Sequence, residues 1–237
     1  ATLWMLIGFC LLLGLFLSLR TGIFFTGRNL INILEANSFK LLLAIGMTFV
    51  IASGGIDLSV GSILSLSAIF TALCMKQNIP VWLAILVGLL SGILMGLING
   101  ALIHFTGINA FIITLGTSFL YRGLALIVTR GTPVSKLPAA YRAFGGGDIF
   151  QVESGVYMAL LVLLLSIPLL YKMRWGHYIT TLGGNPVALR RCGVRTGAWR
   201  ISTFAVMGFL AALAGIIISA RLNSAEPNAG LNMEMDA

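Results

Sequence analysis

Long apolar runs, separated by short polar segments, make up most of this sequence. Several of these runs approach the roughly 20 residues that a helix needs to cross a bilayer. This pattern predicts an all-α protein, a polytopic bundle of membrane helices. The predicted spans are residues 1–19, 41–56, 58–75, 80–103, 110–129, 155–171 and 201–220.

Residues 20–40 mix charged and apolar side chains, which predicts a helix at the membrane interface rather than a span. Residues 41–75 are too long for one crossing, because as an unbroken helix they would extend about 52 Å at about 1.5 Å per residue. The hydrocarbon core is only about 30 Å thick. We therefore expect a broken or re-entrant helix near 54–57 and two crossings. A single crossing is the alternative, because the modest positive charge of residues 20–40 favours it.

Asp57 is a carboxylate in an apolar stretch, which marks the break as a candidate for function. In a structural interpretation Gly54–Gly55 ends the first half-helix, and Asp57 caps the second by accepting from the amide of Ser59 or Val60. In a functional interpretation the half-helix ends, with Ser59 and Ser62, line a transport pathway. We favour capping, with contact to substrate secondary.

Further polar side chains inside predicted spans could bond a polar substrate. They are Asn99, Thr114, Thr117 and Ser118. The hydroxyls have a simpler interpretation, because Ser and Thr in membrane helices mostly bond to their own backbone or to a neighbouring helix.

Four glycines recur at every fourth residue of the span 80–103. They are Gly88, Gly92, Gly96 and Gly100. This spacing places them on one ridge of a helix, where a neighbouring backbone can approach closely. The ridge therefore predicts tight helix packing and names no function.

Charge gives the chain an orientation. Only 9% of the residues are charged, against about 25% in soluble globular chains, so the net charge of +8 indicates basic cytoplasmic loops rather than nucleic-acid binding. The segment 172–200 carries six basic residues and no acid, which places it in the cytoplasm. Segments 131–154 and 221–237 have balanced or acidic charge, and we expect an irregular loop and a tail on the outside.

The cytoplasmic segment contains a short helix with a signal at both ends, predicted near 186–192. Asn185 is a good N-cap, Pro186 is favoured at the first helical position, and Gly193 suits a left-handed C′ position. One interpretation is an interfacial helix whose arginines meet lipid phosphates. The other is a docking helix for a cytoplasmic subunit. The residues of this candidate coupling loop are Gly183, Gly184, Asn185, Pro186, Val187, Ala188, Leu189, Arg190, Arg191 and Gly193.

This loop resembles the EAA-type loop of ABC-importer permeases, a Glu-Ala-Ala triplet followed by three residues and Gly. Val187–Ala188–Leu189 and Gly193 occupy that frame, with Val187 in place of the acid and Leu189 in place of the second small residue. Four more motifs resemble the ribose-type sugar-importer permeases, which include ribose, xylose, arabinose and galactoside permeases. They are GMTFVIASGGIDLSVGS at 46–62, GINAFIITLGT at 107–117, GGNP at 183–186 and ARLNSAEPNAG at 220–230.

The resemblance implies a function and a set of partners. The chain is expected to be a single transmembrane permease domain, 1–237, which lacks a C-terminal portion found in the family. It is expected to move a pentose or hexose from the periplasm through the bacterial inner membrane. The implied partners are cytoplasmic ATP-binding subunits, a second permease subunit and a periplasmic sugar-binding protein. The permease itself is expected to bind no cofactor, metal or nucleic acid and to hold no catalytic residue. ATP and Mg²⁺ belong to the partner ATPase, and this sequence has no GxxxxGK[ST] phosphate loop.

Three other function classes are open on the residues alone. A secondary transporter would use the broken helix and Asp57, but would need an inverted repeat and an ion site. An intramembrane enzyme would have to rely on His104, His177 and Cys192, without any catalytic motif. A purely structural subunit would explain the glycine ridge, but not a carboxylate inside the membrane.

Overall fold

The computed structural model describes residues 2–236, which divide after residue 37 into two compact units. Residues 1 and 237, the ends of the predicted domain, lie outside the described residues. The helices are α1 Thr2–Thr21, α2 Gly27–Ala52, α3 Val60–Lys76, α4 Val81–Thr106, α5 Ala110–Thr129, α6 Ala139–Gly146, α7 Ser154–Tyr171, α8 Arg174–Gly184, α9 Pro186–Arg191, α10 Thr196–Leu222 and α11 Met233–Asp236. The strands are β1 Val134–Ser135, β2 Asp148–Ile149, β3 Val152–Glu153 and β4 Ser224–Ala225.

The prediction of an all-α membrane bundle is confirmed. Within residues 2–236, five helices are long and apolar enough to cross a membrane, namely α2, α4, α5, α7 and α10. The predicted spans 1–19 and 58–75 correspond to shorter apolar helices, Met5–Thr21 within α1 and Val60–Lys76.

The boundary predicted at residue 41 is wrong. α2 is one helix from Gly27 to Ala52, so residues 27–40 of the segment predicted to be interfacial form its first half, and residues 20–21 belong to α1. The Thr26 hydroxyl accepts from the amide of Asn29 at 3.4 Å and marks the start of the helix. Charged side chains do not end a helix, and no Gly or Pro interrupts residues 28–45.

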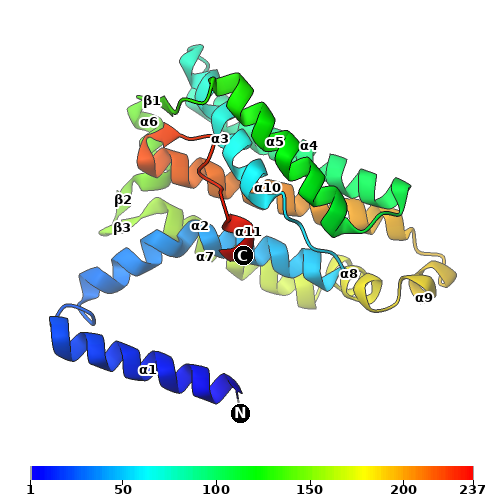
Figure 1. Cartoon of the computed structure of the whole chain (residues 1–237), viewed down its shortest axis with the longest axis horizontal. Helices are drawn as coiled ribbons and strands as arrows, with labels where there is room; N and C mark the ends of the chain where they lie inside the picture. The colour runs from blue at the N-terminus through cyan, green and yellow to red at the C-terminus, as the bar shows by residue number, and fades with distance from the viewer. Residues whose placement is uncertain (1, 237) are drawn as a thin grey trace. The chain divides into compact units, whose positions relative to one another are not determined.

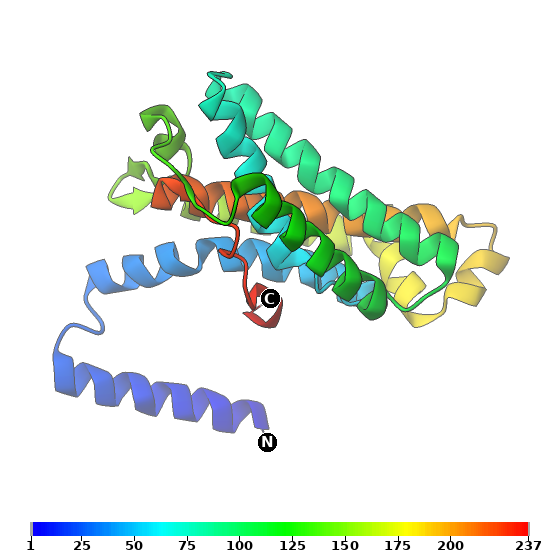
Figure 2. The same ribbon diagram turned by 45° about the horizontal axis from the view of Figure 1, so that its top comes forward.

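The core of the second unit forms around α10, which packs on α3, α4, α6 and α8. Figures 1 and 2 show α10 along the middle of this unit, with α4 beside it over most of its length. The fully buried side chains of Phe204, Met207 and Ile216 come from α10, and those of Ile63 and Leu64 come from α3. Burial of this apolar surface, together with close backbone packing, stabilises the unit.

The glycine ridge of α4 faces α10. A Cβ added at Gly92 would overlap Ala212, one at Gly96 would overlap the Phe204 carbonyl oxygen, and one at Gly100 would lie 2.7 Å from the Ile201 Cα. Gly88 instead faces Thr71 and Ser67 of α3. The neighbour of the ridge is therefore another part of the same chain.

Two connections hold more structure than the sequence indicated. The predicted irregular loop 131–154 contains α6 and the β2–β3 hairpin, and β1 pairs with β4 antiparallel. The segment 172–200, predicted to be cytoplasmic, contains α8, whose residues Ile179 and Leu182 are fully buried. Both helices were missed because they are short: their burial depends on α10, which a local pattern does not reveal.

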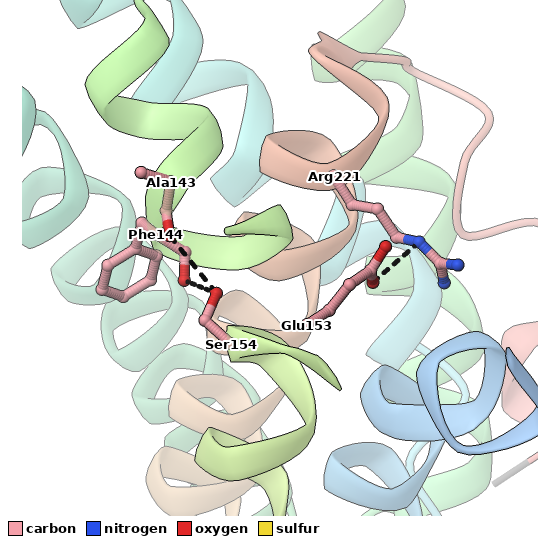
Figure 3. A network of polar contacts seen from close by, with 5 residues as sticks. All are labelled: Ala143, Phe144, Glu153, Ser154 and Arg221. Atoms are coloured by element: carbon pink, nitrogen blue, oxygen red, sulfur yellow. Dashed lines mark hydrogen bonds and ion pairs between the residues drawn. The ribbon is translucent and has the colours of Figure 1, made fainter. Parts of the chain in front are cut away.

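Polar contacts tie segment 131–154 to the end of α10. Figure 3 shows the Glu153 carboxylate 3.0 Å from the Arg221 guanidinium nitrogen Nε, and the Ser154 hydroxyl donating to the Phe144 carbonyl at 2.7 Å. The Tyr141 hydroxyl bonds to the hydroxyl of Ser219 at 2.6 Å, and burial raises the pKa of Tyr141, so this phenol stays protonated. These contacts make 131–154 a fixed part of the fold.

The elements of the second unit fall at two ends. α8 and α9 lie at one end, and α6 with the β1, β2 and β3 strands lies at the other (Figures 1 and 2). The tail predicted outside begins beside β1, but it then returns to α3, where the Gly230 amide donates to the Ser65 hydroxyl at 2.9 Å.

Candidate functional site

The connection Ser53–Ser59 joins α2 to α3 and carries most of the predicted pathway residues. α2 ends in a Schellman motif: the Gly54 amide donates to the Ile51 carbonyl at 2.9 Å, and the Gly55 amide donates to the Val50 carbonyl at 3.0 Å. Gly54 has a φ of +82°, the left-handed conformation that this motif requires at C′. The two glycines therefore end the helix, as the sequence predicts.

Asp57 begins the turn into α3. Its Oδ1 accepts from the Ser59 amide at 2.8 Å and from the Ser59 hydroxyl at 2.6 Å. The side chain is fully buried, and its Oδ2 has no hydrogen-bond partner among the side chains that the structure describes, those of residues 5–9 and 11–235. The predicted bond to the Ser59 amide is thus confirmed, but the predicted cap is not: the N-cap of α3 is Ser59, whose side chain makes no cap bond. Asp57 lies two residues earlier, and its Oδ1 stabilises the turn that leads into the helix.

A chain of hydrogen bonds continues from this turn into α4 and α5. The Asn99 amide nitrogen donates to the Ser59 hydroxyl at 2.7 Å, and the Tyr121 hydroxyl donates toward Asn99 Oδ1 at 3.1 Å. All four side chains of this polar chain, Asp57, Ser59, Asn99 and Tyr121, are buried. Asn99 was among the predicted polar candidates. Tyr121 was not, because the only feature of the sequence that could indicate its role is a phenol hydroxyl within an apolar span.

Thr114 of α5 joins the connection a second time. Its hydroxyl accepts from the Leu58 amide at 3.0 Å and donates to the Ala110 carbonyl at 2.8 Å. The hydroxyls of Ser62 and Thr117 bond instead to nearby backbone carbonyls, those of Ser59 and Thr114. Of the predicted hydroxyls, Thr114 is thus the one that holds the connection from α5.

The predicted coupling loop is divided between two helices. Gly183 and Gly184 end α8, which corrects their assignment to a loop, and α9 follows as Pro186–Arg191. Asn185 separates the helices, and its Oδ1 accepts from the Ala188 amide at 2.9 Å. This is the predicted N-cap.

α9 ends as α2 does. The amide of Gly193 donates to the Arg190 carbonyl at 3.0 Å, that of Val194 donates to the Leu189 carbonyl at 3.3 Å, and Gly193 has a φ of +78°. Of the six residues of α9 only Leu189 is buried, and Val187 is 60% exposed. A two-turn helix that buries one side chain presents most of its surface outward.

The two regions that the sequence singled out separately lie in contact. Gly183, at the end of α8, lies against the connection: a Cβ added there would overlap the Ala52 carbonyl oxygen and lie 2.9 Å from the Gly54 nitrogen. Beside this contact is a cavity of about 190 Å³. Its lining comes from Ser53–Gly55, Ile103, Gly107–Ala110, Arg200 and Phe204. The ends of α2, α4, α5 and α10 thus meet around one cavity near α8.

Comparison with known proteins decides the class of the chain. Residues 29–237 match a family model described as the permease component of branched-chain amino acid transport systems. The chain belongs to this permease family. The ribose import permease protein RbsC of Haemophilus influenzae is 37% identical over 218 residues, which cover 90% of this chain and 68% of that protein. RbsC of Bacillus subtilis is 37% identical over 232 residues, covering 95% and 72%. The D-allose transport system permease protein AlsC of Escherichia coli is 35% identical over 225 residues, covering 94% and 69%. No solved structure matches the chain.

Membership of the family settles the function class. The permease is a multi-pass protein of the bacterial inner membrane and a non-catalytic transport subunit, whose ATPase is a partner subunit. This excludes the intramembrane enzyme, the purely structural subunit, and the secondary transporter that would use Asp57. Among residues 5–9 and 11–235, whose side chains the structure describes, no three His, Cys, Asp or Glu side chains gather as a metal site would require.

Proposed function

We propose that the permease imports a monosaccharide, a pentose such as ribose or a related hexose. The support is the similarity to ribose and D-allose permeases, which extends over at least 90% of the chain at 35–37% identity. The family description names branched-chain amino acids, but a match of this length to sugar permeases is the more specific guide. The sugar arrives from a binding protein on the outside and leaves at the end where α8 and α9 lie.

The function rests on α9 as the docking helix of the ATPase, and the exposure of α9 carries this proposal. Leu189 anchors the helix, while Val187, Arg190 and Arg191 stay exposed. Asn185 and Gly193 fix its two ends, so α9 is a short, rigid, protruding helix of defined orientation. A pair of ATP-binding subunits would hold two such helices, one from each of two permease subunits.

The break between α2 and α3 is proposed as the wall of the sugar path near its cytoplasmic exit. Ser53–Gly55 lines the cavity of about 190 Å³, and Arg200 adds a donor to it. Asp57 bonds to its own turn and is not among the residues that line this cavity, so its role is to hold the turn that leads into α3. Ser59 and Asn99 likewise position the break instead of binding sugar.

Reconstitution tests both parts of this proposal. The permease, its ATPase and its binding protein are placed in proteoliposomes, and uptake of labelled ribose, D-allose and leucine is measured with and without ATP. We expect ATP-dependent uptake of a sugar and none of leucine. Ala188→Asp places a charge on the exposed face of α9 and should abolish co-purification of the ATPase and uptake, while Ala188→Ser, which adds an oxygen without charge, should retain both. Uptake of leucine would refute the proposed sugar substrate. Full uptake by Ala188→Asp would refute docking of the ATPase on α9.

A further inference from the structure

The end of α8 and the end of α2 approach each other closely enough that a side chain would not fit. The contact is between backbones: Gly183 faces the Ala52 carbonyl and the Gly54 nitrogen, and a Cβ added at Gly54 would lie 3.1 Å from the Gly183 Cα. The next residue, Gly184, has no such restriction, because a Cβ added there would meet no described atom within 4 Å. Glycine is therefore required at one of two adjacent positions and not at the other.

α8 is held as a rigid element between α9 and the bundle. The Trp175 indole donates to the Ser202 hydroxyl of α10 at 3.0 Å, and its ring packs edge-on against Phe49 of α2, with centroids 5.1 Å apart. Ile179 and Leu182, one and two turns later, are fully buried. The helix thus has one firmly packed face that ends at Gly183.

No flexible linker separates α8 from α9. The Asn185 amide donates to the Thr181 carbonyl of α8 at 2.8 Å, and the Asn185 side chain accepts from the Ala188 amide of α9 at 2.9 Å. One residue is hydrogen-bonded to both helices. A displacement of α9 must therefore reach the end of α8, where Gly183 lies.

The opposite side of the contact is joined to the transmembrane helices. Leu58 is bonded to Thr114 of α5 and Ser59 to Asn99 of α4, at 3.0 and 2.7 Å. The connection is therefore joined to α4 and α5 by hydrogen bonds, and to α8, among the described residues, by backbone contact without a hydrogen bond. Through such a contact, movement of the end of α8 displaces the end of α2 directly, and no hydrogen bond has to break first.

We propose that the Gly183–Gly54 backbone contact transmits movement of α9 to the break between α2 and α3, and that Gly183 is a positioning residue for transport. Glycine at 183 allows the end of α8 to press directly on the end of α2, next to the cavity lined by Ser53–Gly55. A side chain there would hold the two helix ends apart. The inference rests on the proposed docking of the ATPase at α9, and it adds where that motion enters the membrane bundle.

Gly183→Ala tests the contact, with Gly184→Ala as its matched control. A Cβ at position 183 would overlap the Ala52 carbonyl oxygen, so in Gly183→Ala the ends of α8 and α2 must move apart, while the buried side chains of Ile179 and Leu182 are unchanged in identity. The complete transporter, loaded with sugar-bound binding protein, is compared for ATP hydrolysis and for sugar uptake per ATP. In Gly183→Ala we expect uptake per ATP to fall by about tenfold while hydrolysis stays within about twofold, a change typical of lost coupling between sites. Gly184→Ala should match the wild type in both.

Hydrogen exchange on the wild-type complex provides a second measurement that needs no variant. ATP binding should change amide exchange in residues 186–191 and, together with it, in residues 53–58. If 186–191 respond and 53–58 do not, or if Gly183→Ala retains wild-type uptake per ATP, the transmission contact is refuted while docking stands. Equal loss of coupling in Gly184→Ala would also refute it. If amide exchange in residues 186–191 is the same with and without the ATPase subunit, the proposed docking of the ATPase on α9 is itself refuted.

Discussion

Glycines bring backbones together in two regions of this permease, and the surroundings of the two contacts differ. On α4, Gly92, Gly96 and Gly100 lie against α10 over three successive turns, deep in the unit, with Asn99 and Met95 of the same helix buried beside them. At the end of α8, Gly183 makes a single contact with Ala52 and Gly54, and both glycines are exposed on their remaining sides.

The difference indicates what each contact can do. A ridge of glycines that repeats along two long helices can separate only if both helices move, because every turn adds another backbone contact. A single contact between two helix ends can open or close while the helices stay intact. Glycine therefore fixes α4 against α10 along several turns, whereas at Gly183 it allows the end of α8 to move against the α2–α3 connection.

Gly96→Leu is the strongest test of the glycine ridge on α4. A leucine at this position must displace the Phe204 carbonyl and the Ala205 backbone, so we expect destabilisation of about 3 kcal/mol or more, the upper end for overpacking. Yield of monodisperse permease and the midpoint of thermal unfolding measure the effect. Gly116→Leu on α5 is the control, since a Cβ there meets no described atom within 4 Å. Normal yield of Gly96→Leu would show that the glycine ridge is not needed to hold α4 against α10.

Asp57→Leu tests the connection between α2 and α3, and we expect it to lower folding stability by less than Gly96→Leu does. Leucine removes the acceptor for the Ser59 amide and hydroxyl, and an unsatisfied buried donor costs about 1–3 kcal/mol. Asp57→Asn keeps an acceptor at Oδ1 and should retain both stability and uptake. Thermal unfolding and sugar uptake are measured on both variants. A stable Asn variant that cannot transport would show that the charge, rather than the turn, is what transport requires.

Tyr121→Phe should have the smallest effect of the three. It removes the hydroxyl that bonds to Asn99 Oδ1 and to the Met95 carbonyl, at 3.1 and 3.2 Å, and a bond of this kind contributes about 0.5–1.5 kcal/mol. The Asn99–Ser59 bond remains, so the connection stays joined to α4. Thermal unfolding of Tyr121→Phe is compared with that of Tyr157→Phe, which removes an exposed hydroxyl. A loss as large as that of Asp57→Leu would mean that Tyr121 stabilises the connection more strongly than its bonds to Asn99 and Met95 suggest.

Local features of the site could be predicted from the sequence. Gly54–Gly55 ends α2, Asp57 accepts from the Ser59 amide, Asn185 caps α9, and Gly193 adopts the left-handed conformation. Each of these depends on hydrogen bonds within five residues along the chain, so the residue types at those positions carry the information. The predicted span 110–129 has the observed bounds for a similar reason, because Asn109 is the N-cap of α5 and its side chain accepts from the Phe111 amide.

Errors arose where a boundary depends on distant residues. The first half of α2 contains Glu35 and Lys40, and its polar composition gave no sign that it continues the span. α8 has a buried face only because α10 lies beside it. A composition-based boundary records polarity along the chain, whereas a helix continues until its backbone hydrogen bonds end.

The sequence by itself determined that this protein is a membrane helix bundle, that α2 ends at Gly54–Gly55, that Asp57 accepts from the Ser59 amide, and that Asn185 caps α9. Only the tertiary structure decided that the ridge of α4 meets α10, that Ser59 bonds to Asn99 40 positions away, and that Gly183 lies on Gly54. The physical reason is the range of the interactions. Turns and caps form between neighbours in sequence, but the approach of two backbones depends on how whole helices dock, and the glycines that permit it do not specify their partner.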